Sequence, residues 1–334
     1  MTTTATSTRV GPIGRLGRFA ADHVRGVALA WAIAAVALGA FAPKVDTALS
    51  GAGWQANGSE SVQARTLIQQ NFAGLSSSAL TVVVHSPTAT TSAPAFRQTV
   101  ARVERILAAD RHVASVQAPR RGASISSDGH TAVVTAGAKR GPTAMVAAAG
   151  ALESKLKAAG GSSVGVSLTG SSGMWNDFNT ANRKAMIKSE FLSWPVTMAI
   201  IVLAFGSLVA AGLPLLLTIL GLVSSAGLLA LLTHGFDISI WAMNFALMFS
   251  LALGIDYALF VVHRFRGALF GSGLEVRDAV AVTMDTAGKA VLFSGLTVLV
   301  SLSAVMLVPS PAFRSTALGI ILSVVFVLAA TLTL

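Results

Sequence analysis

The chain contains several long stretches without Asp, Glu, Lys or Arg, separated by segments of ordinary polarity. The hydrocarbon core of a bilayer is about 30 Å thick and needs roughly 20 apolar residues in a helix. The stretches therefore predict six transmembrane helices, because the run 191–236 is long enough for two helices, separated near Gly206 to Pro214 where Gly and Pro interrupt it. The stretches are 26–43, 191–236, 238–262 (uncharged except for Asp256), 290–313 and 315–334.

The first apolar stretch also has features of a cleaved secretion signal, namely a basic lead and the small residues Ala40 and Ala42. However, the run is long for a signal core, and Pro43 directly after the cleavage point would hinder processing. We therefore expect an uncleaved transmembrane helix over 26–43, preceded by a cytoplasmic segment over residues 1–25.

Residues 44–189, between the first and second predicted helices, have the pattern of a folded domain outside the bilayer. Apolar spacing predicts helices over two ranges, and short β-prone runs predict four strands. The order β-α-β, β-α-β is typical of a small ferredoxin-like α+β domain. The strands are expected over Ala79–His85, His112–Gln117, Thr131–Ala136 and Val164–Thr169, and the helices over Ala93–Ala109 and Pro142–Ala159. The predicted fold class is an α-helical polytopic membrane protein with this domain inserted after its first helix.

Composition and charge exclude several classes of protein. Only 11% of the 334 residues are charged and 53% are hydrophobic, against about 25% charged in soluble domains, so a fully soluble enzyme is not expected. The chain has no cysteine, which excludes disulfide scaffolds and thiol chemistry. Residues 44–189 hold 15 basic and 7 acidic residues, so they supply +8 of the net charge of +10. That basicity indicates either an anionic lipid surface or an ordinary solvated face, and nucleic acid is not an expected partner.

Basic residues in short loops predict the orientation, since such loops stay on the cytoplasmic side. Arg residues precede the first helix, and further basic residues lie in the loop at about 264–288. Both segments are therefore expected in the cytoplasm, with an amphipathic helix over 273–280, and residues 44–189 outside. The turn His234–Ser239, with Asp237, would face outward. The chain is thus predicted to be a multi-pass protein of the cell (inner) membrane with a cytoplasmic N-terminus.

Asp256 is the strongest candidate for a functional residue. It lies about 24 Å along the predicted helix from Ile240 at 1.5 Å per residue, and a carboxylate at such depth is costly and usually functional. A carboxyl group that gains and loses a proton at this depth could carry protons in a proton-driven process. Tyr257, the only tyrosine of the chain, follows directly and points about 100° away around the helix. The alternative is an Asp that is hydrogen-bonded for helix packing alone.

Three hydroxyl residues on the fifth predicted helix lie at a matching depth. Ser294, Thr297 and Ser301 are spaced by three and four residues and share one helix face. Their hydroxyls would either support a proton relay at Asp256 or bond to the carbonyls of their own helix. Glu190 and His263 are weaker candidates, expected at the membrane surfaces. The histidines show no metal-ligand spacing, and no Walker A or G-x-S-x-G sequence occurs, so we expect neither an enzyme nor a cofactor or metal site.

Several segments together resemble the MmpL-type transporters of the resistance-nodulation-division superfamily. The segment GIDYALFVVHRFR (254–266), followed by AGKAVLFSGLTVLVS (287–301), is similar to the fourth and fifth helices of that family. FGSLVAAGLPLL (205–216), LGRFAADHVRGVALAW (16–31) and GSESVQAR (58–65) resemble other parts of it. The order of one helix, one porter domain and five helices is the half-repeat of the family.

This resemblance implies a membrane transporter that exports lipidic or hydrophobic substrates, driven by the proton gradient. It assigns the proton relay to Asp256 and Tyr257. Family members usually contain two such halves, whereas this sequence is expected to be one half-repeat or a truncated form. The implied partners are membrane lipids, the substrate, protons and either a second copy of the chain or a complementing second half. The alternative function is a non-transporting membrane scaffold or lipid sensor with the same fold.

Overall fold

The chain divides into two compact units in a computed structural model, which describes residues 10–43, 49, 53–236 and 238–334. One unit comprises Met1–Leu49, Ser189–Val308 and Ala312–Leu334, and is called the helical unit here. The other comprises Ser50–Lys188 and Pro309–Pro311, and is called the exterior unit after the location that the sequence predicts for it. Asp237, expected in an outward turn, lies outside the described residues.

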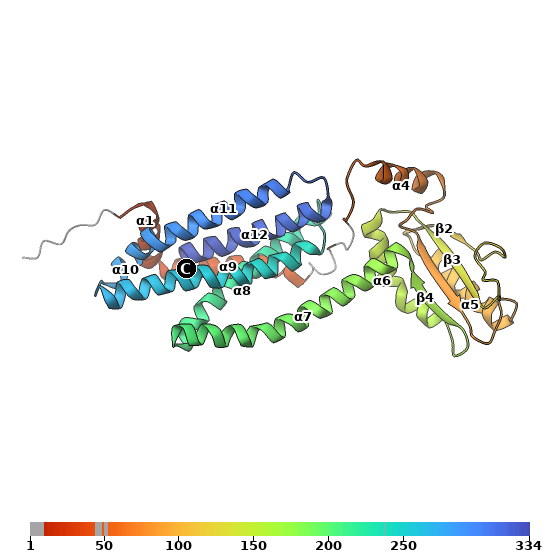
Figure 1. The fold of residues 1–334 in the computed structure, drawn as a ribbon, viewed down its shortest axis with the longest axis horizontal. Helices are drawn as coiled ribbons and strands as arrows, with labels where there is room; N and C mark the ends of the chain where they lie inside the picture. Colours follow the sequence, from red (N-terminus) through yellow and green to blue (C-terminus); the bar gives the residue numbers. More distant parts are fainter. Residues whose placement is uncertain (1–9, 44–48, 50–52, 237) are drawn as a thin grey trace, which may run out of the picture. The chain divides into compact units, whose positions relative to one another are not determined.

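The helical unit is built almost entirely of apolar helices, and together the described helices confirm a helical membrane protein (Figure 1). Five helical segments are long and apolar enough to cross a membrane, or six if the bent pair α1 and α2 counts as one span. The helices are α1 (Pro12–Asp22), α2 (Val24–Gly39), α7 (Gly170–Phe205), α8 (Leu208–Leu232), α9 (Trp241–Arg266), α10 (Val276–Thr283), α11 (Lys289–Val305) and α12 (Pro311–Thr333). The first part of α7, up to Lys188, belongs to the exterior unit. Two π-helical turns, Gly267–Gly271 and Met284–Gly288, join α9 and α11 to the short α10.

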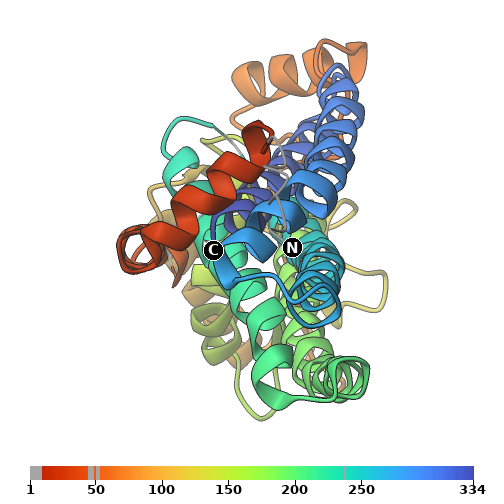
Figure 2. The same cartoon turned by 90° about the vertical axis from the view of Figure 1, so that its left-hand side faces the viewer.

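The first predicted span differs from the structure, because it is only the second part of a bent helix pair. α1 and α2 meet at His23 with an angle of 90°, and α2 ends at Gly39 rather than Pro43. Figure 2 shows α1 lying across the ends of the other helices. The sequence pattern did not predict α1. Arg15, Arg18 and Asp22 interrupt its apolar residues, so no long uncharged run marks this helix.

The second and third predicted spans separate at the start of the expected interval. α7 ends at Phe205 and α8 begins at Leu208, while Gly206 has a φ of +64°, which favours glycine. The Arg266 guanidinium donates a hydrogen bond of 2.8 Å to the Phe205 carbonyl and so satisfies the end of α7. Pro214 does not interrupt the helix but lies inside α8. α7 also begins at Gly170, well before the predicted start of the span.

The exterior unit confirms the ferredoxin-like prediction. Its four strands form an antiparallel sheet in the order β2-β3-β1-β4, and one helix follows β1 and another follows β3. The strands are β1 (Leu80–His85), β2 (Val113–Gln117), β3 (Thr131–Ala138) and β4 (Gly165–Thr169), and the helices are α5 (Pro94–Ala108) and α6 (Pro142–Ala159). An additional helix, α4 (Glu60–Asn71), precedes β1 and was not predicted.

One face of this sheet forms the core with α5 and α6. On β1, Leu80, Val82 and Val84 are completely buried, as the alternation of a half-buried strand requires. Phe96 from α5 and Met145 from α6 are buried against them. This core lies wholly within the exterior unit, so the sheet and its two helices are held together by their own apolar contacts.

Candidate proton-relay site

The site lies on α9, and a close helix contact fixes the position of this helix. Gly254 packs on Thr218 of α8, and a Cβ atom at Gly254 would collide with the Thr218 hydroxyl oxygen. The Thr218 hydroxyl donates a hydrogen bond of 2.9 Å to the Pro214 carbonyl of its own helix. A residue larger than glycine would therefore push α8 and α9 apart. This contact gives the glycine of the G-I-D-Y sequence a structural role.

Asp256 lies two residues later, on the opposite side of α9, and its side chain is exposed in the isolated chain. It belongs to an exposed row that we call the open face of α9, which comprises Met248, Ala252, Asp256, Leu259 and Phe260. Asp256 is about 22 Å from the start of α9 at Trp241 and about 15 Å from its end, at 1.5 Å per residue. The carboxylate accepts no hydrogen bond within the described part of the chain. The structure thus presents this acid on an apolar surface rather than inside the unit.

Tyr257 points the other way and is buried, with 6% of its surface exposed. It forms an apolar cluster with Met284, Val291 and Leu328. Its hydroxyl oxygen lies 3.5 Å from the hydroxyl oxygen of Ser294 on α11. Asp256 and Tyr257 therefore occupy two different environments, as expected for neighbours that diverge by about 100° on a helix.

The three hydroxyl residues of α11 have different partners. Ser294, Thr297 and Ser301 are all exposed. The Thr297 hydroxyl donates to the Phe293 carbonyl and the Ser301 hydroxyl donates to the Thr297 carbonyl, each at 2.9 Å. Ser294 alone contacts the Asp-Tyr pair, and it does so through Tyr257. The structure therefore brings Ser294 and Tyr257 together, while Thr297 and Ser301 bond along their own helix.

The two weaker candidates, Glu190 and His263, are not part of the Tyr257–Ser294 contact. Glu190 is half-buried in α7, and His263 is exposed near the end of α9. Sequence reasoning missed two polar residues of α9, Asn244 and Ser250, whose buried side-chain oxygen atoms have no hydrogen-bond partner among the described residues. A polar residue within an apolar run is the signal that would have found them. The described residues contain no group of three or more His, Cys, Asp or Glu side chains arranged to hold a metal ion.

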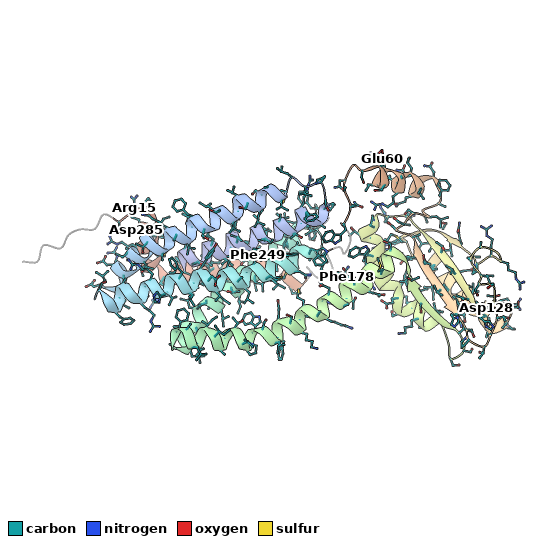
Figure 3. The ribbon with its side chains drawn as sticks, viewed as in Figure 1. Arg15, Glu60, Asp128, Phe178, Phe249 and Asp285 are labelled. Atoms are coloured by element: carbon teal, nitrogen blue, oxygen red, sulfur yellow. The ribbon has the colours of Figure 1, made fainter. Side chains whose placement is uncertain are left out.

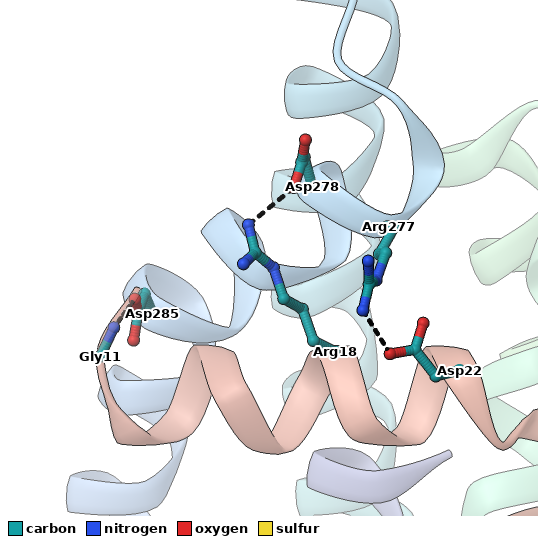
Figure 4. Close-up of polar contacts among 6 residues, drawn as sticks. All are labelled: Gly11, Arg18, Asp22, Arg277, Asp278 and Asp285. Atoms are coloured by element: carbon teal, nitrogen blue, oxygen red, sulfur yellow. Dashed lines mark hydrogen bonds and ion pairs between the residues drawn. The ribbon is translucent and has the colours of Figure 1, made fainter. Parts of the chain in front are cut away.

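A second polar cluster fixes α1 to α10 at one end of the helical unit, where Figure 3 labels Arg15 and Asp285. The Arg18 guanidinium pairs with Asp278 and the Arg277 guanidinium pairs with Asp22, both at 2.7 Å (Figure 4). The Asp285 carboxylate accepts hydrogen bonds from two backbone N–H groups at the start of α1, those of Gly11 and Gly14. The carboxylate thus satisfies donors that a helix start leaves unpaired.

Small residues allow α1 to approach this cluster closely. A Cβ atom at Gly14 would lie 2.7 Å from the Asp285 carboxyl carbon and 2.8 Å from the Ala281 carbonyl oxygen. A Cβ atom at Gly17 would lie 2.5 Å from the Met284 side chain. The contact between α1 and α10 therefore depends on glycine at both positions, and it links the first helix to the segment between α9 and α11.

Comparison with known proteins agrees with this architecture. Residues 53–334 match the MMPL family. The chain is 29% identical over 317 residues to the protein named mycolic acid-containing lipids exporter MmpL11 of Mycolicibacterium smegmatis, covering 91% of this chain and 33% of that protein. It is 38% identical over 155 residues to the protein named heme uptake protein MmpL11 of Mycobacterium tuberculosis, covering 46% of this chain and 16% of that protein.

A third relative has a different named substrate. The chain is 28% identical over 137 residues to the trehalose monomycolate exporter MmpL3 of Mycolicibacterium smegmatis, covering 41% of this chain and 13% of that protein. The chain spans a third or less of the length of each of these relatives. Because the family match extends over most of the chain, through both units, this protein belongs to the MMPL family, whose architecture is of the resistance-nodulation-division type.

Proposed function

We propose that the chain is one half of a proton-driven transporter that exports lipidic or hydrophobic molecules, with Asp256 and Tyr257 as its proton relay. Asp256 takes up and releases the proton. Tyr257 is held in the core beside Ser294. Through its hydroxyl group it transmits the change in protonation of Asp256 to α11. The relay acts as a positioning and proton-carrying device and needs no cofactor.

The observation that carries this proposal is the exposure of Asp256 on the open face of α9. An acid at the centre of a lipid-facing helix costs about 2.5–3.5 kcal/mol on insertion scales, so such residues face protein or a water-filled path. The neighbours of Asp256 on this face, Met248 and Phe260, are 64% and 50% exposed and offer apolar contact area. A second half that covers this face would enclose the carboxylate and leave it accessible to protons alone.

The covering half is either a second copy of this chain or a complementing polypeptide of the same type. In a two-fold pair, the open faces of two α9 helices would meet, and each face would be covered by the same residues of its partner. Because Tyr257 is buried in its own unit, a partner acid would reach it through Ser294, an exposed residue whose hydroxyl lies beside that of Tyr257. This arrangement differs from a direct contact between Asp256 of one copy and Tyr257 of the other.

The end of the helical unit that holds α1 and α10 is the proposed cytoplasmic end. Its described basic residues outnumber its acids, and basic residues near span ends favour the cytoplasm. The basic residues are Arg15, Arg18, Arg25, Arg264, Arg266, Arg277 and Lys289, and the acids are Asp22, Glu275, Asp278 and Asp285. This orientation places the exterior unit outside the cell membrane, where a lipid leaving the bilayer would meet it.

The names of two relatives favour lipid cargo, and the name of a third favours heme. The test is transport into proteoliposomes that contain the full chain, with an imposed pH gradient and two probes, a trehalose monoester with a fluorescent acyl chain and hemin. The proposal expects gradient-dependent movement of the lipid probe that a protonophore abolishes. Binding of the probe without gradient-dependent movement would contradict it and support a scaffold or lipid sensor, while movement of hemin alone would overturn the lipid cargo.

A further inference from the structure

A cavity of about 420 Å³ lies in the helical unit, on the side of α9 away from Asp256. This volume is within the range of about 300–1,000 Å³ found for small-molecule sites. Residues of α1, α2, α8, α9, α10 and α12 line it, among them Ala21, Ala258, Phe265 and Val280. The lining contains no charged side chain and is aliphatic or aromatic except for its glycine, one methionine and three threonines. Such a lining suits an aliphatic chain.

One polar atom in this lining has no partner. The Thr331 hydroxyl donates to the Val327 carbonyl at 2.8 Å, and the Thr333 hydroxyl donates to the Ala329 carbonyl at 2.6 Å. The Thr283 side chain is 2% exposed, and within the described residues its hydroxyl makes no hydrogen bond. A buried hydroxyl without a partner is unfavourable, so a ligand that supplies an acceptor would restore the missing hydrogen bond.

The charge around the cavity favours an anionic ligand. The lining residues have more basic than acidic sequence neighbours. The basic neighbours are Arg18, Arg25, Arg264, Arg266 and Arg277, and the acids are Asp22, Glu275 and Asp285. Arg25 is exposed and forms no ion pair within the described part of the chain. The basic residues outnumber the acids at this end of the unit, so a phosphate group at the cavity entrance would meet net positive charge.

We propose that this cavity holds an acyl chain of an anionic phospholipid, with the Thr283 hydroxyl donating a hydrogen bond to the acyl ester. The apolar lining accounts for the acyl chain, the unpaired hydroxyl for the ester and the net positive charge at this end of the unit for the anionic headgroup. The cavity lies on the side of α9 away from Asp256, although Met284 both lines it and packs in the cluster around Tyr257. Lipid binding there requires neither a gradient nor transport. The inference therefore goes beyond the proposed function and does not rest on it.

Trp31 provides a natural reporter for the site. Its indole N–H donates a hydrogen bond of 2.9 Å to the Thr333 hydroxyl, and Thr333 lines the cavity. A variant in which the other four tryptophans (Trp54, Trp175, Trp194 and Trp241) are replaced by phenylalanine retains only this reporter. Bromine atoms on an acyl chain quench tryptophan fluorescence at short range, so bound probe would quench Trp31.

The experiment titrates phosphatidylglycerol with a brominated acyl chain into this variant in detergent, with brominated phosphatidylcholine as the second probe. We expect saturable quenching with at least tenfold tighter binding of phosphatidylglycerol. Ala21→Phe, which fills the cavity, should weaken that binding at least tenfold, whereas Ala290→Phe, on the exposed surface of α11, should leave it unchanged. Equal binding of both lipids, or binding that Ala21→Phe does not weaken, would overturn the proposal.

Thr283→Val keeps the test decisive if the larger side chain disturbs folding. Valine has nearly the same shape and lacks the unpaired hydroxyl, so the lipid-free protein should unfold at the same or a higher temperature. Binding of phosphatidylglycerol should nevertheless weaken several-fold. Unchanged binding by Thr283→Val would show that the hydroxyl does not meet the ligand and would overturn the assigned hydrogen bond.

Discussion

The Tyr257 hydroxyl oxygen lies 3.5 Å from the Ser294 hydroxyl oxygen, so the residue that follows Asp256 is tied to α11 rather than to the open face of α9. If this pair transmits protonation of Asp256, Tyr257→Phe should lower gradient-driven transport about tenfold or more, as for other positioned proton-transfer groups. Removing one such hydrogen bond costs only about 0.5–1.5 kcal/mol of stability, so the protein should stay folded. The measurement is the initial rate of probe transport in proteoliposomes.

Ser294→Ala is the companion test of the same contact. The two changes remove opposite ends of one interaction, so the double variant should be no slower than Tyr257→Phe alone. Thr297→Ala is the control, because the Thr297 hydroxyl bonds to its own helix. Fully additive losses for Tyr257→Phe and Ser294→Ala would show that the two hydroxyls act independently.

Gly14 should be a position of high structural sensitivity. A methyl group there would collide with Asp285 and with the Ala281 carbonyl, and overpacking of this kind costs about 1–3 kcal/mol. We therefore expect Gly14→Ala to lower the thermal unfolding midpoint of the purified protein. Gly26→Ala is a matched control, because nothing lies within 4 Å of the added atom and alanine is the better helix former, by up to about 1 kcal/mol. An equal effect of the two changes would mean that α1 does not pack on α10 as described.

The open face of α9 should lie close to a partner in the membrane. The chain has no cysteine, so Met248→Cys provides a single thiol on this face. We expect a bismaleimide crosslinker to join two copies in membranes if the covering half is a second copy. Val36→Cys, on α2 and 74% exposed, should not be joined. Crosslinking at Val36 and not at Met248 would argue against a two-fold pair through α9.

The local stability of the turn around Asp128, in the exterior unit, should depend on pH. The Ser126 hydroxyl donates a hydrogen bond to its carboxylate, and the His130 backbone N–H donates a second. Both hydrogen bonds lower the pKa of Asp128 below its ordinary value of 3.8, and the one from Ser126 has the larger effect. A lowered pKa in the folded state contributes stability above the unfolded value, and this stability is lost as the pH falls through the folded value.

The turn around Asp128 should therefore protect its amides at neutral pH and lose this protection only below about pH 3.8, the ordinary pKa of the carboxyl group. Hydrogen exchange of the peptide that contains residues 126–131 measures the effect. Asp128→Asn is the control, and its exchange should show no such change once the intrinsic dependence of exchange on pH is subtracted. The same transition in both proteins would exclude Asp128 as its cause.

The exterior unit could be predicted well from sequence because local signals and tertiary structure agree there. Pro142 at the first turn of α6 and the alternating burial of β1 both mark their elements directly. The two π-helical turns beside α10, and the first part of α7, carry no comparable signal. The bend between α1 and α2 was missed because charged residues of α1 find partners on α10, a contact that no local pattern contains.

For the candidate site, the sequence suggests the residues but does not reveal their surroundings. The depth of Asp256 follows from counting along a helix, and so does its divergence from Tyr257. Which of the two faces the core depends on the packing of α9 against α8, which Gly254 and Thr218 set. Spacing likewise placed Ser294 and Thr297 on one face, whereas only the fold brings the Ser294 hydroxyl to Tyr257.

The most direct test of the proposed function is gradient-driven transport by Asp256→Asn. Asparagine keeps the size of the side chain and removes the group that carries the proton. Asp177→Asn, at an exposed position of α7 in the exterior unit, is the matched control. We predict that Asp256→Asn folds, retains probe binding and loses transport driven by the pH gradient, while Asp177→Asn transports normally. Full gradient-dependent transport by Asp256→Asn would contradict the assignment of Asp256 as the proton carrier.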